Sequence, residues 1–505
     1  MPTNQLKAGA LLNYVIIGLN AFVGLVYTPY MLHKLGQSEY GLYSLVGSVI
    51  AYLTLMDFGF GNAVVRYTAK YRAEGKHEEM YHLFGMFFLI YAIISLLGLG
   101  GGLALYFNVD AMFGDTMTSI ELERAKVMML ILTFNLVFTF LFQIYGSIVT
   151  AFESFVFLKG IQIVRIILQT LIMVLVLSIG YKAVAMVVVV TFFNLATLIS
   201  NYIYCKSKIK IKIKFGYFDK SLLKEIAVYS FWIFLNLIMN KVYWSTGQFV
   251  LGAVSGTIAV SVFSVAILLE GMYMNFSTAI ASVFLPRVTS MVASHKSDKE
   301  ISDLFVRTGR VQYIIMSFVL SGFLVFGLPF IHIWAGYEYT NAYYISVMFF
   351  VSLLIPLIQN LGITILQARN QMKFRSLLYL AISVISLLGQ IVLSKMYGEV
   401  GCAIAISLAL LIGQGLIMNI YYRRRQHLDI KQFWIEIGKM SVFPVFITII
   451  GLVILRYIHI DSWFSLAIGV VVFTLVYAPL FWHFSMSQYE KELMNSLVKK
   501  VYHKA

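Results

Sequence analysis

The stretch GALLNYVIIGLNAFVGLVYTPYM, from Gly9 to Met31, contains 23 consecutive residues without a charged side chain. An α-helix needs roughly 20 apolar residues to cross a bilayer. Only Lys7 precedes the stretch as a charged residue, and no convincing small-residue cleavage site is present. We therefore interpret it as a first membrane-spanning helix rather than a cleavable signal peptide.

Similar apolar stretches recur along the whole chain. Hydrophobic residues make up 60% of the 505 residues and charged residues 12%, with a mean hydropathy of +0.84. A water-soluble core of this size does not need that composition. We predict fourteen spanning helices, at residues 9–31, 40–64, 81–107, 125–149, 156–179, 183–205, 226–252, 256–285, 311–334, 341–367, 376–397, 401–422, 437–457 and 462–484.

Lysine and arginine are concentrated in alternate gaps between the predicted helices. The cation-rich gaps are residues 66–76, 206–224, 287–310, 369–375 and 423–425. Short cytoplasmic loops of membrane proteins retain such cations, so the pattern predicts that both termini are cytoplasmic. The net charge of +15 reflects this topology and attraction to anionic lipid headgroups. A nucleic-acid partner is not indicated.

Two local features add to this picture. The segment SKIKIKIKF, from Ser207 to Phe215, alternates in the manner of a strand. Its place after the sixth predicted helix favours instead a basic segment lying on anionic lipid headgroups. The two cysteines, Cys205 and Cys402, lie within or at the ends of predicted helices, and indicate neither a disulfide framework nor a metal site.

Weak internal repeats relate the two halves of the chain. LGQSEYGLYSL, containing Gly36, parallels VSGTIAVSVFSV, containing Gly256, at an offset of 220 residues. GSIVTAFESF from Gly146 similarly resembles GITILQARNQ from Gly362. We expect two six-helix lobes inserted the same way up, with a substrate site between them. The predicted division is an N-lobe at 1–220, a C-lobe at 221–425, and two accessory helices with a cytoplasmic tail at 426–505.

Polar residues inside the predicted helices mark a candidate cavity, because such residues are costly in lipid. At about 100° per residue, those of the first helix share one face, and those of the seventh share a wider one. The candidates are Asn13 and Asn20 in the first helix, Asn236, Asn240, Lys241 and Gln248 in the seventh, and Glu270 in the eighth. Two alternatives stay open: Lys241 and Glu270 neutralise each other, or the amides only bridge helices.

The segment LMDFGFGNAVVRYTAKY, from Leu55 to Tyr71, contains Asp57, two following glycines and Arg66. It resembles the signature of Wzx-type polysaccharide and O-antigen flippases of the multidrug/oligosaccharidyl-lipid/polysaccharide (MOP) exporter superfamily. TPYMLHKLGQSEYGLYSL near the N-terminus and LQAR at Leu366–Arg369 resemble the same family. The resemblance covers essentially the whole chain.

This resemblance implies an all-α polytopic membrane protein, with two pseudo-symmetric six-helix lobes in a V shape and two additional C-terminal helices. It also implies a flippase that moves undecaprenyl-pyrophosphate-linked oligosaccharide across the bacterial inner membrane by alternating access. The product would be O-antigen, capsule or another surface polysaccharide. The implied partners are membrane lipids and a polysaccharide polymerase. The first helix lacks the arginines of murein-precursor flippases, which disfavours lipid II as cargo.

Charged residues suggest how such a protein would work. Arg66, Arg165, Arg287 and Arg369 are expected near the inner mouth, where they would recruit pyrophosphate or simply anchor the topology. Asp57 and Glu270 are candidates for coupling to a proton or sodium gradient. A structural alternative for Asp57 is a tie to a cation on a neighbouring helix. The chain has no GxxxxGK[ST] loop for ATP, and we predict no cofactor and no metal site.

Other functions remain as alternatives to this hypothesis. A cation-coupled multidrug exporter shares the superfamily scaffold, and a non-transporting protein of polysaccharide assembly is a further alternative. A membrane glycosyltransferase or polymerase is disfavoured, because no outer gap is long and the HExxH and GxSxG patterns are missing. The sequence therefore predicts a transporter rather than an enzyme.

Overall fold

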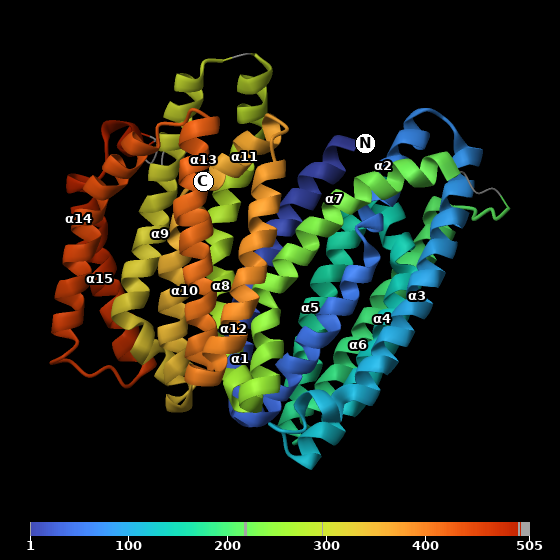
Figure 1. Ribbon diagram of the computed structural model, residues 1–505, viewed down its shortest axis with the longest axis horizontal. Helices are drawn as coiled ribbons and strands as arrows, with labels where there is room; N and C mark the ends of the chain where they lie inside the picture. Colours follow the sequence, from blue (N-terminus) through green and yellow to red (C-terminus); the bar gives the residue numbers. More distant parts are fainter. Residues whose placement is uncertain (1, 217–219, 295, 493–494, 496–505) are drawn as a thin grey trace. The chain divides into compact units, whose positions relative to one another are not determined.

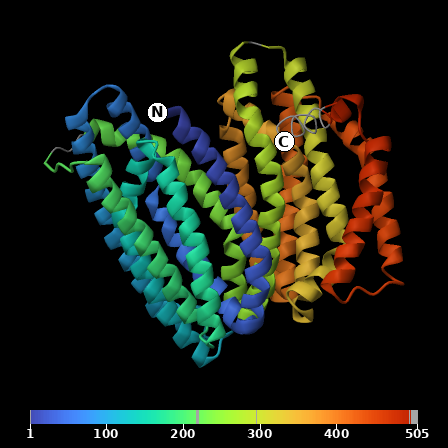
Figure 2. The same ribbon diagram turned by 180° about the vertical axis from the view of Figure 1, so that it is seen from behind.

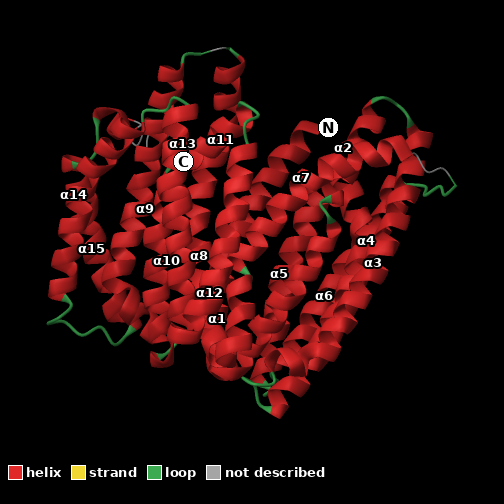
Figure 3. Cartoon of the chain, viewed as in Figure 1, coloured by secondary structure: helices red, strands yellow, loops and turns green. Residues whose placement is uncertain are grey.

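A computed structural model describes residues 2–216, 220–294, 296–492 and 495. In this part of the chain the regular structure is helical throughout, joined by short turns, with no strand (Figure 3). The predicted all-α polytopic fold is confirmed. The chain divides into two compact units, Met1–Ser264 and Val265–Ala505, and each is described by itself.

The first unit contains the helices coloured blue to green in Figure 1. Its helix α4 packs between α3 and α6, and α5 packs along α1 (Figures 1 and 2). The elements are α1 (Pro2–Leu53), η1 (Thr54–Asp57), α2 (Phe60–Ala73), α3 (His77–Phe113), α4 (Ser119–Ala151), α5 (Phe155–Ser178), α6 (Ala183–Tyr204), η2 (Cys205–Ile209), α7 (Lys220–Trp244) and the first part of α8 (Thr246–Ala293).

The second unit contains the rest of α8 and all later helices. Within it, α10 packs against both α9 and α12, whereas α14 and α15 pack together on α9. The elements are α9 (Asp298–Trp334), η3 (Tyr337–Tyr339), α10 (Thr340–Ile358), α11 (Asn360–Ala368), α12 (Lys373–Leu410), η4 (Leu411–Ile417), α13 (Met418–Arg425), α14 (Ile430–Ile454) and α15 (Trp463–Phe484).

Eleven helical stretches of the described chain are long and apolar enough to cross a membrane, which makes this a multi-pass membrane protein. Three of them, Ala8–Ala73, Leu237–Thr278 and Lys373–Arg425, each cover two of the fourteen predicted spans. The number of continuous stretches is smaller than the number of predicted helices because, at kinks, one helix runs into the next without an intervening loop. Non-helical backbone angles occur in these stretches at Gly36, Gly256 and Gly398.

Two of these kinks have nearly the same backbone conformation. Gly36 has φ 76° and ψ 170°, and Gly256 has φ 81° and ψ −176°. A positive φ is accessible to glycine because it has no Cβ. These are the two glycines that the sequence repeat pairs at an offset of 220 residues, so their shared geometry supports the repeat. The three-part division of the chain stays a prediction.

Replacement of Gly36 by alanine is expected to lower the free energy of unfolding by about 1–3 kcal/mol, because this combination of φ and ψ is essentially restricted to glycine. No heavy atom lies within 4 Å of the new Cβ, so backbone strain is the only cost. Gly18→Ala is the matched control, since Gly18 lies on the same helix with equal space and no positive φ. Thermal unfolding in detergent compares the two variants. Equal melting temperatures for Gly36→Ala and Gly18→Ala would contradict the role of backbone strain at Gly36.

The lysine- and isoleucine-rich segment after α6 packs on protein. Ile211 and Ile213 are partly buried against a hydrophobic cluster, whereas Lys210 and Lys212 are exposed. The Lys214 N–H donates a hydrogen bond of 3.2 Å to the Tyr81 carbonyl on α3. A Cβ on Gly85 would lie 2.0 Å from the Lys214 carbonyl oxygen, so glycine is what permits this approach. Contact with lipid headgroups stays a prediction, and it concerns only the exposed lysines of this segment.

Candidate functional site

The DFGFGN motif forms the turn between the first helix and α2. Helix η1 ends at Asp57, and Phe58 and Gly59 both adopt positive φ, of 51° and 76°. A Cβ on Gly61 would lie 3.3 Å from Gln143 Nε2 and 3.5 Å from Ser147 Oγ. The glycines therefore make the turn and let α2 approach α4 closely, which explains their spacing around the aspartate.

Asp57 is held inside the first unit by neutral donors. Tyr91 on α3 donates its hydroxyl at 3.0 Å and Gln143 on α4 donates its amide at 3.1 Å, both to Asp57 Oδ1. No cation forms an ion pair with Asp57 among the described residues. Intramembrane carboxylates usually pair or face a polar cavity. Asp57 faces such a cavity.

A cavity of ≈ 430 Å³ lies beside Asp57. Seven of its eleven lining residues have polar side chains; the lining consists of Asp57, Gly61, Asn62, Val65, Thr139, Gln143, Gly146, Ser147, Thr150, Leu198 and Asn201. Five of these residues, from Thr139 to Thr150, come from one stripe of α4 at helical spacing. We call this cavity the Asp57 pocket. The DFGFGN motif identified Asp57 as a candidate site residue. The lining residues on α4 and α6 belong to no motif of this kind, so the sequence did not identify them as site residues.

Arg165 lies close to the middle of α5, as the eleventh of its 24 residues. Its place near the inner mouth stays a prediction. It donates hydrogen bonds to Gln169 at 3.2 Å and to Asn194 on α6 at 3.3 Å. Asn194 in turn donates to Asn135 and Thr139 on α4, at 2.6 and 2.7 Å. All these partners are neutral, so the arginine charge has no carboxylate partner among the described residues.

The predicted polar face of the first helix lies beside α5. Asn13 accepts a 2.9 Å hydrogen bond from Lys159 Nζ, and both Asn13 and Asn20 are exposed. Lys159 forms no ion pair in the described part of the chain. It was missed because, in sequence, one lysine near a helix start is indistinguishable from a topology anchor. Lys159 and Arg165 thus both lie on α5 without an ion pair to a described carboxylate.

Candidates from the seventh and eighth predicted helices are only partly described. Gln248 donates a 2.8 Å hydrogen bond to Ser264. Lys241 is partly buried and has no ion pair with any described residue. Glu270 is 4% exposed, and its Oε1 has no hydrogen-bond partner. The side chains of Asn236, Asn240 and Arg287 lie outside the described residues.

Two of the four arginines predicted at the inner mouth, Arg66 and Arg369, differ in their contacts. Arg369 donates to the Gln426 carbonyl at 2.9 Å and forms an ion pair with Asp298 at 2.6 Å. Its donors are thus largely used within the protein, which favours a structural role. Arg66 is exposed on α2, with its guanidinium 5.7 Å from the ring centre of Tyr67. It stays a candidate for substrate contact.

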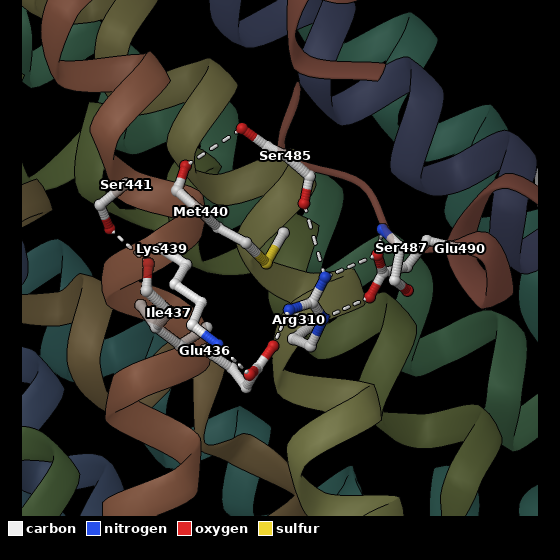
Figure 4. Close-up of polar contacts among 9 residues, drawn as sticks. All are labelled: Arg310, Glu436, Ile437, Lys439, Met440, Ser441, Ser485, Ser487 and Glu490. Atoms are coloured by element: carbon white, nitrogen blue, oxygen red, sulfur yellow. Dashed lines mark hydrogen bonds and ion pairs between the residues drawn. The ribbon is translucent and has the colours of Figure 1, made fainter. Parts of the chain in front are cut away.

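An ion-pair network around the buried Arg310 and Glu490 in the second unit was not anticipated from the sequence (Figure 4). Arg310 on α9 is 8% exposed and Glu490, beyond α15, is 1% exposed. Arg310 donates to both carboxylate oxygens of Glu490, at 2.5 and 2.9 Å, and to Glu436 on α14 at 2.5 Å. Lys439 pairs with Glu436 at 3.1 Å. We call these four residues the Arg310 clamp.

The clamp fixes the charge state of its buried carboxylate. Burial alone would raise the pKa of Glu490, but the hydrogen bonds from Arg310 and Ser487 outweigh burial and hold that pKa below its usual range. The Ser487 N–H lies 2.6 Å from Glu490 Oε2. Sequence separation of 180 residues between Arg310 and Glu490 explains why no sequence pattern revealed the pair.

Comparison with known families gives one match over more than half of the chain. Residues 6–292 match the model of a family described as polysaccharide biosynthesis protein. Over 503 residues the chain is 22% identical to EpsK, an uncharacterized membrane protein of Bacillus subtilis (strain 168). That alignment covers 95% of this chain and 96% of the relative.

Comparison with solved structures identifies the fold. The lipid II flippase MurJ, in an inward closed conformation, has a TM-score of 0.71 at 17% identity, covering 94% of this chain and 98% of that one. An inward-facing multidrug resistance MATE family transporter of the MOP superfamily has a TM-score of 0.56 at 13% identity, covering 81% and 99%. The family match confirms the resemblance that the sequence predicts, and these solved structures show the same fold.

Proposed function

Because the chain belongs to the polysaccharide biosynthesis protein family, we propose that it is a flippase for undecaprenyl-pyrophosphate-linked oligosaccharide. It moves the repeat unit across the bacterial inner membrane by alternating access, for O-antigen, capsule or another surface polysaccharide. Both termini face the cytoplasm, as the distribution of lysine and arginine predicts. A polysaccharide polymerase in the same membrane is a further partner.

The observation that carries this proposal is the polar, charged interior of the first unit. Sugar hydroxyls and a pyrophosphate cannot cross hydrocarbon unaided, because their hydrogen bonds would be lost and their charges left unpaired. The Asp57 pocket supplies hydrogen-bonding groups within a membrane-spanning bundle. Arg165 and Lys159 supply positive charge that no described carboxylate neutralises, which suits a phosphate-bearing ligand.

Transport also requires a source of free energy. Asp57 and Glu270 are intramembrane carboxylates without a cationic partner among the described residues, and such groups bind a proton or a metal cation readily. We infer that movement of the substrate is coupled to a proton or sodium gradient through one or both of them.

A second candidate function is favoured by the fold alone. The similarity to a multidrug resistance transporter makes export of apolar cations an alternative. A deletion strain distinguishes the two: loss of a lipid-linked oligosaccharide flippase leaves glycan-bearing carrier lipid accumulated in the inner leaflet. Increased drug retention with normal surface polysaccharide would instead support the exporter.

Arg165→Gln is expected to slow translocation of the glycan-bearing lipid by at least about tenfold, because losing one charged hydrogen-bond partner costs roughly 1.5–3 kcal/mol. Arg165→Lys keeps the charge and should retain part of the rate. Lys126→Gln is the control, because Lys126 is already paired with Asp110 on the surface. Translocation is measured in proteoliposomes; equal rates for Arg165→Gln and wild type would contradict the assigned role.

A further inference from the structure

The Asp57 pocket contains polar groups that the protein leaves unsatisfied. Asn201, which lines the pocket from α6, is only 8% exposed, yet its side-chain oxygen has no hydrogen-bond partner. Buried polar atoms without a partner are rare in folded proteins. The Ser147 side chain on α4 also forms no hydrogen bond with described residues. Ser147 and Asn201 both line the pocket, so a ligand there would contact their side chains.

The mixture of donors and acceptors indicates what kind of ligand would fit. Amide and hydroxyl groups of Asn62, Ser147 and Asn201 can each donate and accept, and the Asp57 carboxylate accepts only. A bare metal cation would use acceptors alone, and an apolar drug would need mostly apolar walls. A sugar ring presents hydroxyls that both donate and accept. The volume of ≈ 430 Å³ lies within the usual range for small-ligand sites.

The position of the pocket within the unit suits an entering substrate. It extends along α4 to Thr150, the penultimate residue of that helix, and along α6 to Asn201 near its end. Arg72, in a cation-rich gap, donates a 3.2 Å hydrogen bond to the Ala151 carbonyl at the same end of α4. The pocket therefore reaches toward the end of the bundle that the lysine and arginine pattern predicts to be cytoplasmic.

We propose that the Asp57 pocket binds one sugar residue of the transported glycan on the cytoplasmic side, before translocation. Asn201 and Ser147 bond its hydroxyls from α6 and α4, and Asp57 accepts from a further hydroxyl. Gln143 and Tyr91 orient the carboxylate through its other oxygen. This inference rests on the proposed function, and it adds a sugar-recognition site to it.

Cysteine labelling tests the pocket directly. Both native cysteines are buried, so Ser147→Cys in a Cys205→Ala, Cys402→Ala background gives one reporter thiol. The protein is reconstituted in nanodiscs and treated with a charged, water-soluble thiosulfonate. Glycan-bearing carrier lipid extracted from the producing cells, at about ten times its Kd, should slow labelling about tenfold. Undecaprenyl pyrophosphate without sugar should change the rate by less than about twofold at the same concentration.

Three results would overturn the assignment. These are labelling unaffected by either lipid, equal protection by both lipids, and protection by sodium or protons in place of glycan. Failure of wild-type protein to translocate the glycan-bearing lipid would instead refute the proposed function. Translocation is measured in proteoliposomes and labelling in nanodiscs, so the two failures are distinguishable.

A matched pair of variants gives an independent readout. Asn201→Leu and Thr191→Val each remove a buried polar group on α6 whose oxygen has no hydrogen-bond partner, but Thr191 does not line the Asp57 pocket. Both variants should fold and melt alike. Only Asn201→Leu should raise the KM for glycan-bearing lipid, by about tenfold for roughly 1.4 kcal/mol of lost binding. Equal KM values would contradict the proposal.

Discussion

Replacement of Arg310 by methionine is expected to lower the free energy of unfolding by about 3–5 kcal/mol, because it leaves a buried carboxylate unpaired. Glu490 is 1% exposed and takes two hydrogen bonds from Arg310. Thermal unfolding in detergent, followed by loss of helical circular dichroism, measures the effect. The variant should also expose the segment after α15 to proteolysis first, because Arg310 ties that segment to α9.

The control for this variant lies one turn earlier on the same helix. Arg307 is exposed, with its guanidinium 5.3 Å from the ring centre of Tyr489, so Arg307→Met should cost less than about 1 kcal/mol. A double variant, Arg310→Met with Glu490→Met, removes both charges and should recover part of the lost stability. Equal stabilities of Arg310→Met and Arg307→Met would refute the clamp.

The clamp also predicts a pH dependence. The pKa of Glu490 is lowered in the folded protein, so the stability from its ionised form is fully present above the unfolded value of about 4.3. It is lost as pH falls through the lower, folded pKa. In Arg310→Met, burial without the arginine raises the pKa of Glu490 instead, so the penalty in the variant is relieved as pH falls toward the unfolded value. The difference in melting temperature between wild type and Arg310→Met should therefore be largest at neutral to alkaline pH and shrink continuously as the pH falls.

Glu270→Gln is expected to abolish the dependence of transport on an ion gradient. Glu270 is 4% exposed with one unpartnered oxygen, and a buried carboxylate is stable only when a proton or a cation neutralises it. Glutamine keeps the shape but cannot bind or release the coupling ion. In proteoliposomes, an imposed proton or sodium gradient should accelerate wild-type transport and change the variant's rate by less than about twofold, since one charge is removed.

The matched control is Glu123→Gln, which removes an exposed carboxylate near the start of α4. It should retain the response to the gradient. Full gradient dependence in Glu270→Gln would remove Glu270 from the coupling mechanism and leave Asp57→Asn as the next variant to measure.

The sequence predicted the fold well because spanning helices are long and their signal is local. The length of the apolar stretches identified a protein with many membrane-spanning helices. At Gly36 and Gly256 the sequence predicts two separate helices, whereas the structure has one continuous helical stretch with a kink. Hydropathy cannot distinguish two helices joined by a loop from one kinked helical stretch, since a glycine with positive φ can join two spans without a polar loop. The isoleucine face of the segment after α6 was likewise hidden, because its packing partner lies on α3.

The site was predicted less completely, for a physical reason. Asp57 carries a motif, so its importance was visible in sequence. Its partners Tyr91 and Gln143, and the pocket residue Asn201, are single polar residues in otherwise apolar helices. Only the packing of α3, α4 and α6 brings them together. Arg165 was noticed, but its depth depends on where α5 begins, and its neutral partners on α6 and α4 could not be identified from spacing.

The most direct test of the account is translocation by the purified protein. Proteoliposomes are loaded with undecaprenyl-pyrophosphate-linked glycan from the producing cells, and an external glycosidase digests only glycan in the outer leaflet. The account predicts that vesicles with protein, under an ion gradient, progressively expose the inner-leaflet glycan to digestion, whereas protein-free vesicles protect it. Equal protection of glycan in the two kinds of vesicle would contradict the proposed flippase.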